Sequence, residues 1–567
     1  MKKWWALGLA VLLIAATSAA ALAKVENPKV VKGDIGKYGG TFIDYIESDP
    51  KTFNYVLSKD NTSTGVTRLL MFEGLTEMNY WTGEFEPGLA EKWEFSKDGK
   101  TWTFELRKGV TWSDGKPFTA DDVIFSFQLY FDKENASSTR DVFTIDGQLP
   151  QVKKIDDYTV QLVLPKPFAP MLGNMTAPML PKHKLEAAYK AGKFTTTWGV
   201  NAPVKDIVGT GPWVLADYKP GQRIVYTRNP RYWRVDEKGN QLPYMQRLIL
   251  QIVPNAETAS LKFKAGELSG YTVRPEEYRL YKQGERNGNY TVLDGGPDSG
   301  TLFLVLNQNP NTVKAPKLSW FTNVKFRQAL AHAIDKQTMI DSLYDGLAEP
   351  QWAAISVADK LFSNKNVKKY QYDLKKAAEI LESAGFKKGA DGVLKDPKGN
   401  PVEFDLATNS NNTVRVRAAN LMKEDFGKLG IKVNFQPIAF NKLLEQLLTT
   451  FDWDAIVIGL TGTFDPNGGA NTWTSKGGLH MWYPREPKPQ TAWEARLDEL
   501  FEQGAITLDQ KERKKIYDEY QQIVSEEVPM IYTVNQKQFA ALRNSIGNVR
   551  YNARGGYFWN SYQIYIK

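Results

Sequence analysis

The second half of the chain alternates helical and strand patterns, and this alternation constrains the fold more than any other feature. From about Asn323 onward, stretches with apolar residues at helical spacing are separated by short apolar runs. Residues 455–458 (AIVI) form one such run, short and unbroken as the buried strands of a parallel sheet are. One helix is predicted over residues 374–384, with Asp373 as its N-cap and Gly385 just past its end. We therefore predict an α/β sheet here.

The first half is richer in strands. Residues 93–95 and 102–106 alternate apolar and polar side chains, and the Asp98-Gly99 pair between them is a turn signal, which together predict a β-hairpin. A helix is expected to begin at Thr119, because this residue is followed at the third position by an acidic residue that can complete a capping box. The change of pattern near residue 323 indicates two architectures in one chain.

Residues 1–23 have the pattern of a secretory signal peptide: two lysines, an apolar run, and small residues at Ala21 and Ala23. Cleavage would leave Lys24 as the first residue of an exported, periplasmic or extracytoplasmic protein. The alternative is an uncleaved anchor, because residues 4–23 are about long enough to span a bilayer. No later segment has about 18 consecutive apolar residues, so we expect the mature protein to be soluble.

Composition excludes several classes of function. The chain has no cysteine, which excludes a disulfide scaffold, a thiol nucleophile and a lipid-modified N-terminal cysteine. Its 72 basic and 64 acidic residues are mixed without long like-charge blocks, so we expect no nucleic acid partner. The three histidines, His183, His332 and His480, are far apart and belong to no HExxH motif. Without a nucleophile elbow or a phosphate loop, we predict no catalytic residue, no metal site and no cofactor.

A long ordered block of motifs carries a family resemblance. Five segments resemble the signature block of the bacterial extracellular solute-binding proteins of family 5: GLAEKW (88–93), DGKTWTF (98–104), LRKGV (106–110), WSDG (112–115) and PFTADDV (117–123). Further matches follow in order along the chain: VGTGPW (208–213), RNPRYW (228–233), FRQAL (326–330) and AIDK (333–336). That family includes dipeptide-, oligopeptide- and some oligosaccharide-binding proteins.

The resemblance implies an α/β, two-lobed periplasmic-binding-protein-like fold of type II, cluster C. The first lobe would comprise residues 24–300 and a C-terminal return, 535–567, with an extra subdomain at about 55–185. The second lobe would comprise residues 301–534.

Family order places the two hinge strands near residues 302–307 and 529–535. A ligand that contacts both lobes binds the closed form better and shifts the hinge equilibrium toward it. The implied function is that of the substrate-binding component of an ABC importer, a monomer that delivers its ligand to a membrane permease. A secreted enzyme and a receptor subunit for a sensor are the alternatives from other classes.

One motif bears on the ligand. Peptide binders of the family hold the ligand's ammonium with an aspartate three residues before a D-P or E-P pair. The matching pair here is Asp465-Pro466, and the clamp position is Gly462. Thr461 and Thr463 offer neutral hydroxyls that suit a sugar. An oligopeptide-like ligand is the first hypothesis, with Glu47 or Asp465 as a substitute acid, and an oligosaccharide is the alternative.

Aromatic residues complete the predicted site. Trp352 and Trp473 stand in contexts rich in Gly, Pro or Asn, where a flat apolar ring can pack on a ligand. The predicted ligand-binding residues are Glu47, Ser48, Trp352, Thr461, Gly462, Thr463, Phe464 and Trp473.

Overall fold

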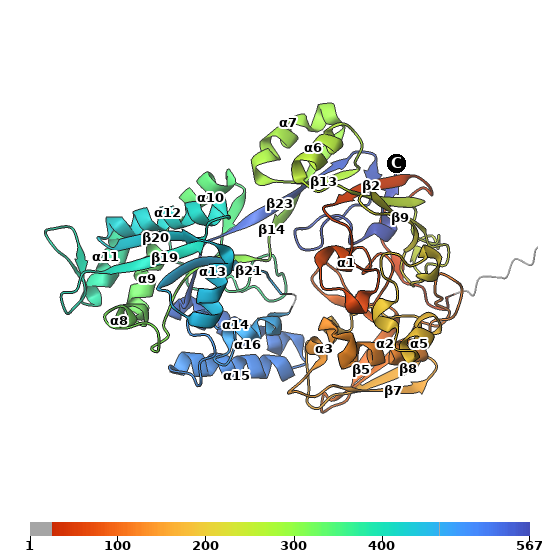
Figure 1. Ribbon diagram of the computed structural model, residues 1–567, viewed down its shortest axis with the longest axis horizontal. Coiled ribbons are helices and arrows are strands. Elements are labelled where there is room, and N and C mark those ends of the chain that lie inside the picture. The colour runs from red at the N-terminus through yellow and green to blue at the C-terminus, as the bar shows by residue number, and fades with distance from the viewer. Residues whose placement is uncertain (1–24, 464) are drawn as a thin grey trace, which may run out of the picture.

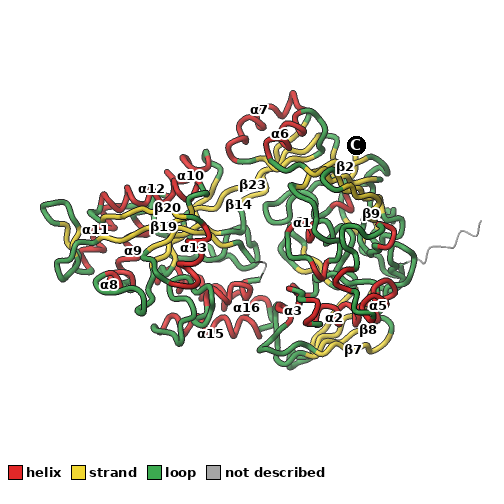
Figure 2. Tube along the Cα trace, in the orientation of Figure 1, coloured by secondary structure: helices red, strands yellow, loops and turns green. Residues whose placement is uncertain are grey.

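The computed structural model of the chain describes residues 25–463 and 465–567 (Figure 1). The predicted signal peptide and Phe464 lie outside the described residues. Among the helices of the described part, none combines the length and the apolar character needed to cross a bilayer. The described chain forms several sheets, which Figure 2 shows as separate groups of strands with helices around them.

A four-stranded antiparallel sheet in the first lobe has the order β5-β6-β8-β7. Its strands are β5 (Ala90–Phe95), β6 (Thr101–Leu106), β7 (Gln151–Asp156) and β8 (Thr159–Val163). The predicted hairpin is confirmed, because β5 and β6 pair across the turn. The helix α2 (Ala120–Phe131) begins after Thr119 with a complete capping box, as predicted. The other helices of residues 24–190 are α1 (Asn61–Gly65), α3 (Ser138–Phe143), α4 (Met171–Asn174) and α5 (Lys182–Lys190) in the described part of the chain.

A second four-stranded sheet of this lobe has the order β2-β12-β10-β9. Its strands are β2 (Thr41–Ile46), β9 (Trp213–Lys219), β10 (Arg223–Arg228) and β12 (Arg247–Ile252). The C-terminal segment returns to the core beneath it: Tyr557 and Ile564 are buried in one cluster with Phe42 and Leu248. The first lobe is therefore built from both ends of the chain.

The second lobe is built on a five-stranded sheet of order β20-β19-β21-β15-β22. Its strands are β15 (Thr301–Leu306), β19 (Glu403–Asn409), β20 (Lys432–Ile438), β21 (Ala455–Leu460) and β22 (Met530–Tyr532). Strands β20, β19 and β21 are parallel, as predicted for 455–458, whereas β15 runs antiparallel to β21. Along β15, Leu304 and Leu306 face one hydrophobic core and Phe303 and Val305 face another, so both faces of the sheet are buried.

Nine helices of the described part belong to this lobe and surround the sheet (Figure 1). They are α8 (Lys317–Phe321), α9 (Val324–His332), α10 (Lys336–Tyr344), α11 (Leu374–Ser383), α12 (Thr413–Lys428), α13 (Phe440–Glu445), α14 (Ala470–Trp473), α15 (Ala492–Ile506) and α16 (Gln510–Glu527). The predicted helix at 374–384 is α11, and the Asp373 side chain accepts a hydrogen bond from Lys376 N as its N-cap.

A third sheet connects the lobes. Strand β23 (Val534–Arg543) lies between β13 (Gly270–Val273) and β14 (Tyr290–Pro297), and it also pairs with β16 (Ala348–Pro350) of the second lobe. Helices α6 (Ala256–Lys264) and α7 (Tyr278–Gly288) lie beside β13 (Figure 1).

The chain crosses between the lobes twice, at residues 298–300 between β14 and β15 and at Thr533 between β22 and β23. Hydrogen bonds join the chain at and beside the two crossings: Thr533 N donates to Leu302 O of β15 at 2.9 Å, and Asn535 Nδ2 of β23 donates to Gly300 O at 2.5 Å. The first crossing precedes the predicted 302–307, because those residues lie almost entirely in β15 of the second lobe. Two adjacent short connections are the geometry of a hinge.

Candidate ligand-binding site

The carboxyl ends of the parallel strands meet at one edge of the second-lobe sheet. Strand β19 ends at Asn409 and is followed by α12. Strand β21 ends at Leu460 and is followed by the loop that begins at Thr461. Ligands of open α/β sheets bind outside such strand ends. Here that edge also lies against the first crossing, because Thr301 pairs with Leu460.

A cavity of about 260 Å³ lies on one side of this loop. Four of the predicted residues line it together: Thr461, Gly462, Thr463 and Trp473. Trp473 is only 6% exposed, and its ring packs against Trp482 and Tyr520. It therefore forms a wall of the cavity from within the core and is not a protruding aromatic platform.

An ion pair that joins the lobes lines the same cavity. Arg554, from the C-terminal return, approaches the Asp359 carboxylate with an Nη1–Oδ2 distance of 3.4 Å and donates from Nη2 to the carbonyl oxygen of Thr463. The other oxygen of Asp359 accepts hydrogen bonds from Leu361 N and Phe362 N. Sequence reasoning missed both charged residues, because nothing in their local sequence marks them.

A second cavity, of about 480 Å³, lies on the hinge side of the loop. It contains one basic and one acidic side chain, Arg415 of α12 and Asp298 of the first crossing. Arg415 Nη1 donates to Asn409 Oδ1 at 2.9 Å, and burial lowers the pKa of its guanidinium. Within the described residues, neither Arg415 nor Asp298 forms a salt bridge, so both charges remain available to a ligand.

Gly462 has a packing reason for being glycine. A Cβ atom at this position would lie 2.2 Å from the carbonyl oxygen of Ser299 in the first crossing. No side chain fits there without a shift of the backbone. The position that the family resemblance assigns to the clamp is thus filled by a close contact between the loop and the first crossing. An aspartate substituted there would test sterics as much as charge.

Asp465 does not replace the missing clamp. Its carboxylate is paired with the Arg513 guanidinium through two hydrogen bonds of 2.5 and 2.6 Å. Such a bidentate pair satisfies the carboxylate with a charge of its own lobe.

The remaining predicted residues lie apart from both cavities. Glu47 and Ser48 are exposed after the end of β2, where the Ser48 hydroxyl lies 3.0 Å from that of Thr62. Trp352 packs against the core of the second lobe, with Lys336 Nζ 4.1 Å from its ring centroid. The pairing of β16 with β23 places Trp352 there, an effect of tertiary structure that its loop-like sequence context does not reveal.

Comparisons with known proteins agree with one another. The family model described as "Bacterial extracellular solute-binding proteins, family 5 Middle" matches residues 84–480. A probable ABC transporter-binding protein of Deinococcus radiodurans is 33% identical over 536 residues, 89% of this chain and 88% of its own. The dipeptide-binding protein of Escherichia coli is 27% identical, covering 88% of this chain and 90% of its own.

A solved structure shares the fold. The ABC transporter substrate-binding protein CtaP from Listeria monocytogenes aligns with a TM-score of 0.74 at 23% identity, over 94% of this chain and 100% of that one.

Proposed function

Because the chain belongs to the bacterial extracellular solute-binding proteins of family 5, we propose that it captures an oligopeptide-like solute between its two lobes and delivers it to the permease of an ABC importer. The relatives described above are named as binding proteins of transporters and not as enzymes, and one of them is named for dipeptides. We propose further that the protein is a monomer and that the signal at 1–23 directs its export. N-terminal sequencing tests the cleavage of this signal, because the mature protein should begin at Lys24.

The observation that carries the peptide proposal is the pair of opposite charges in the hinge-side cavity. A free peptide has a cationic and an anionic end, and each costs several kcal/mol to desolvate unless it is paired. Asp298 supplies a carboxylate for the ammonium. Arg415 supplies a planar guanidinium, which binds carboxylates through two parallel hydrogen bonds. Together they replace the clamp that Gly462 cannot provide.

The loop between the cavities supplies the neutral contacts in this proposal. Thr461, Gly462 and Thr463 lie beside the peptide backbone, and Trp473 supports the loop from behind. Glu47, Ser48 and Trp352 lie outside both cavities and have no role in it. An oligosaccharide has no formal charges to match Asp298 and Arg415, and the names of the relatives give it no support.

Lobe closure accompanies capture. The proposed lobes comprise residues 24–300 with 535–567 and residues 301–534, and they move about the two crossings at 298–300 and Thr533. A peptide in contact with both lobes adds its binding energy only to the closed form, which shifts the equilibrium toward it. The permease then recognises the closed shape.

Mass spectrometry of small molecules released from the purified, denatured protein tests the proposal. We expect short peptides. Calorimetric titration of the released peptide should then show at least about tenfold weaker binding to Arg415→Met and to Asp298→Asn, roughly 1.4 kcal/mol each.

Blocking the peptide termini provides the matched control. An N-acetylated peptide should bind equally to wild type and Asp298→Asn, and a C-amidated peptide equally to wild type and Arg415→Met. Release of a sugar, a porphyrin or a metal chelate in place of peptides would overturn the assignment of the ligand.

A further inference from the structure

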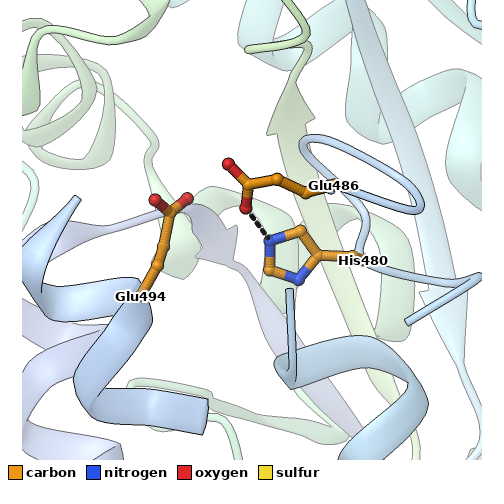
Figure 3. A group of neighbouring side chains, drawn as sticks. All are labelled: His480, Glu486 and Glu494. Atoms are coloured by element: carbon orange, nitrogen blue, oxygen red, sulfur yellow. Dashed lines mark ion pairs between the residues drawn. The ribbon is translucent and has the colours of Figure 1, made fainter. Parts of the chain in front are cut away.

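Three buried side chains that can ligate a metal, His480, Glu486 and Glu494, meet in the second lobe (Figure 3). His480 and Glu486 lie in the segment between α14 and α15, and Glu494 lies in the first turn of α15. They are 0%, 1% and 4% exposed, and one potential ligand atom from each lies within 4.8 Å of the others. None of them has a part in the proposed function.

One hydrogen bond of His480 determines which of its ring nitrogens presents a lone pair to the cluster. Its Nδ1 lies 3.1 Å from the carbonyl oxygen of Thr472, which can only accept, so Nδ1 carries the proton. In the neutral imidazole Nε2 is then an acceptor, and it faces Oε2 of Glu486 at 3.5 Å. Two acceptors would face each other. A proton between them would not form a good bond, because 3.5 Å exceeds the usual N–H···O range.

Glu486 is the more unusual member of the cluster. Neither of its oxygens, nor Nε2 of His480, has a hydrogen-bond partner among the described residues. A buried carboxylate without donors is costly, and nearly all buried polar groups in native proteins are paired. A cation bound among these atoms would accept their lone pairs and satisfy all three of them.

Glu494 adds a second carboxylate, both of whose oxygens accept hydrogen bonds. Oε2 accepts from the backbone and the hydroxyl of Thr491 at 2.9 and 2.7 Å, and Oε1 accepts from Trp482 Nε1 at 2.8 Å. Apart from the approach of His480, neither glutamate has an ion pair with a described basic side chain.

We propose that His480 Nε2, the Glu486 carboxylate and Glu494 Oε1 bind a divalent transition metal ion of the zinc class. An imidazole with two carboxylates suits such an ion better than calcium or magnesium, which take oxygen ligands. Two ligand atoms about 2.1 Å from a tetrahedral ion lie about 3.4 Å apart, close to the 3.5 Å between His480 and Glu486. One divalent cation also neutralises the two carboxylates.

Two surrounding contacts fit this assignment. A ligating histidine characteristically donates its other N–H to a carbonyl or carboxylate, as His480 does to Thr472. Thr472 also lines the 260 Å³ cavity. The ion would connect the segment before α15 to the first turn of that helix and hold the cavity wall, a structural role separate from the transported solute. The sequence prediction of no metal site rested on isolated histidines, and this site needs only one.

Metal analysis of the tag-free, full-length protein tests the proposal. Inductively coupled plasma mass spectrometry should find about one equivalent of zinc or a related ion per chain, retained through dialysis. Glu486→Gln, which preserves the side-chain shape, should lose the ion. His332→Ala is the matched control, because His332 lies apart from this cluster and contacts Gln371 O, and it should retain a full equivalent.

Thermal unfolding separates the outcomes further. Treatment with a chelator should lower the Tm of wild type, and added Zn²⁺ should restore it, whereas Glu486→Gln should respond to neither. Three results would overturn the proposal: no bound metal together with no response to Zn²⁺, equal metal content in Glu486→Gln and wild type, or a higher Tm for Glu486→Gln. The last is expected if the carboxylate is merely buried without a partner.

Discussion

Leu508 offers a test of lobe closure that leaves the ligand cavities untouched. It follows α15 in the second lobe, yet its side chain packs against the hydrophobic core of the first lobe. A Cβ atom on Gly99, in the hairpin turn, would lie 2.8 Å from Leu508 Cδ1. Nearby, Ala169 N of the first lobe donates to Ala505 O at 2.7 Å. These contacts join the two lobes, and we expect opening of the lobes to break them.

The substitution Leu508→Ala should weaken ligand binding without touching the ligand. Complete burial of a leucine side chain stabilises by about 1.5–3 kcal/mol. Leu508 is half-buried, so we expect a loss of about 1 kcal/mol from the closed form alone. That is about a fivefold shift toward the open form, and the measured Kd rises by the same factor when the free protein is mostly open.

Isothermal titration calorimetry with the ligand identified from the purified protein measures this change. Leu280→Ala is the control, because Leu280 is exposed on α7 of the first lobe, and its Kd should stay within about twofold of wild type. An unchanged Kd for Leu508→Ala, in a protein whose radius of gyration still falls on binding, would refute the argument.

Three further predictions concern stability. Burial raises the pKa of Asp44 to about 7, so the protein is most stable with respect to this group below about pH 4, and that stability is lost as the pH rises through 7. In urea unfolding, the Asp44→Asn variant should therefore be more stable than wild type by at least about 1 kcal/mol at pH 8, and by less at pH 5. The substitution Gly462→Ala places a Cβ 2.2 Å from Ser299 O and should lower the free energy of unfolding by about 1–3 kcal/mol. Its control is Gly427→Ala, in a helix with open space around it, which should leave the stability in thermal unfolding unchanged or raise it. Trp473→Ala should cost about 3–5 kcal/mol in urea unfolding, because the ring is packed in the core, and a loss of affinity without this cost would favour a stacking role.

Local signals predicted local structure well. The turn at Asp98-Gly99 and the capping box at Thr119 depend on residues a few positions apart, and the structure forms both. The cap at Asp373 and the buried strand at 455–458 were also predictable, because each is determined by burial or capping within one element.

The candidate site was only partly predictable, for a physical reason. A motif near a strand end predicted Thr461 and Gly462, which line both cavities. Asp298 and Arg415 share a cavity only because the first crossing passes beside β21 and α12, and no spacing in the sequence encodes that contact. Arg415 had one available signal, its position three residues after the N-cap Asn412 at the end of a parallel strand.

Small-angle X-ray scattering with and without the released peptide tests the central claim, that this chain closes two lobes on a peptide-like solute. At a peptide concentration that calorimetry shows to be saturating, we expect the radius of gyration of the wild-type protein to fall. A peptide blocked at both ends should no longer bind, and it should leave the radius of gyration unchanged. An unchanged radius of gyration at saturation with the free peptide would contradict the account.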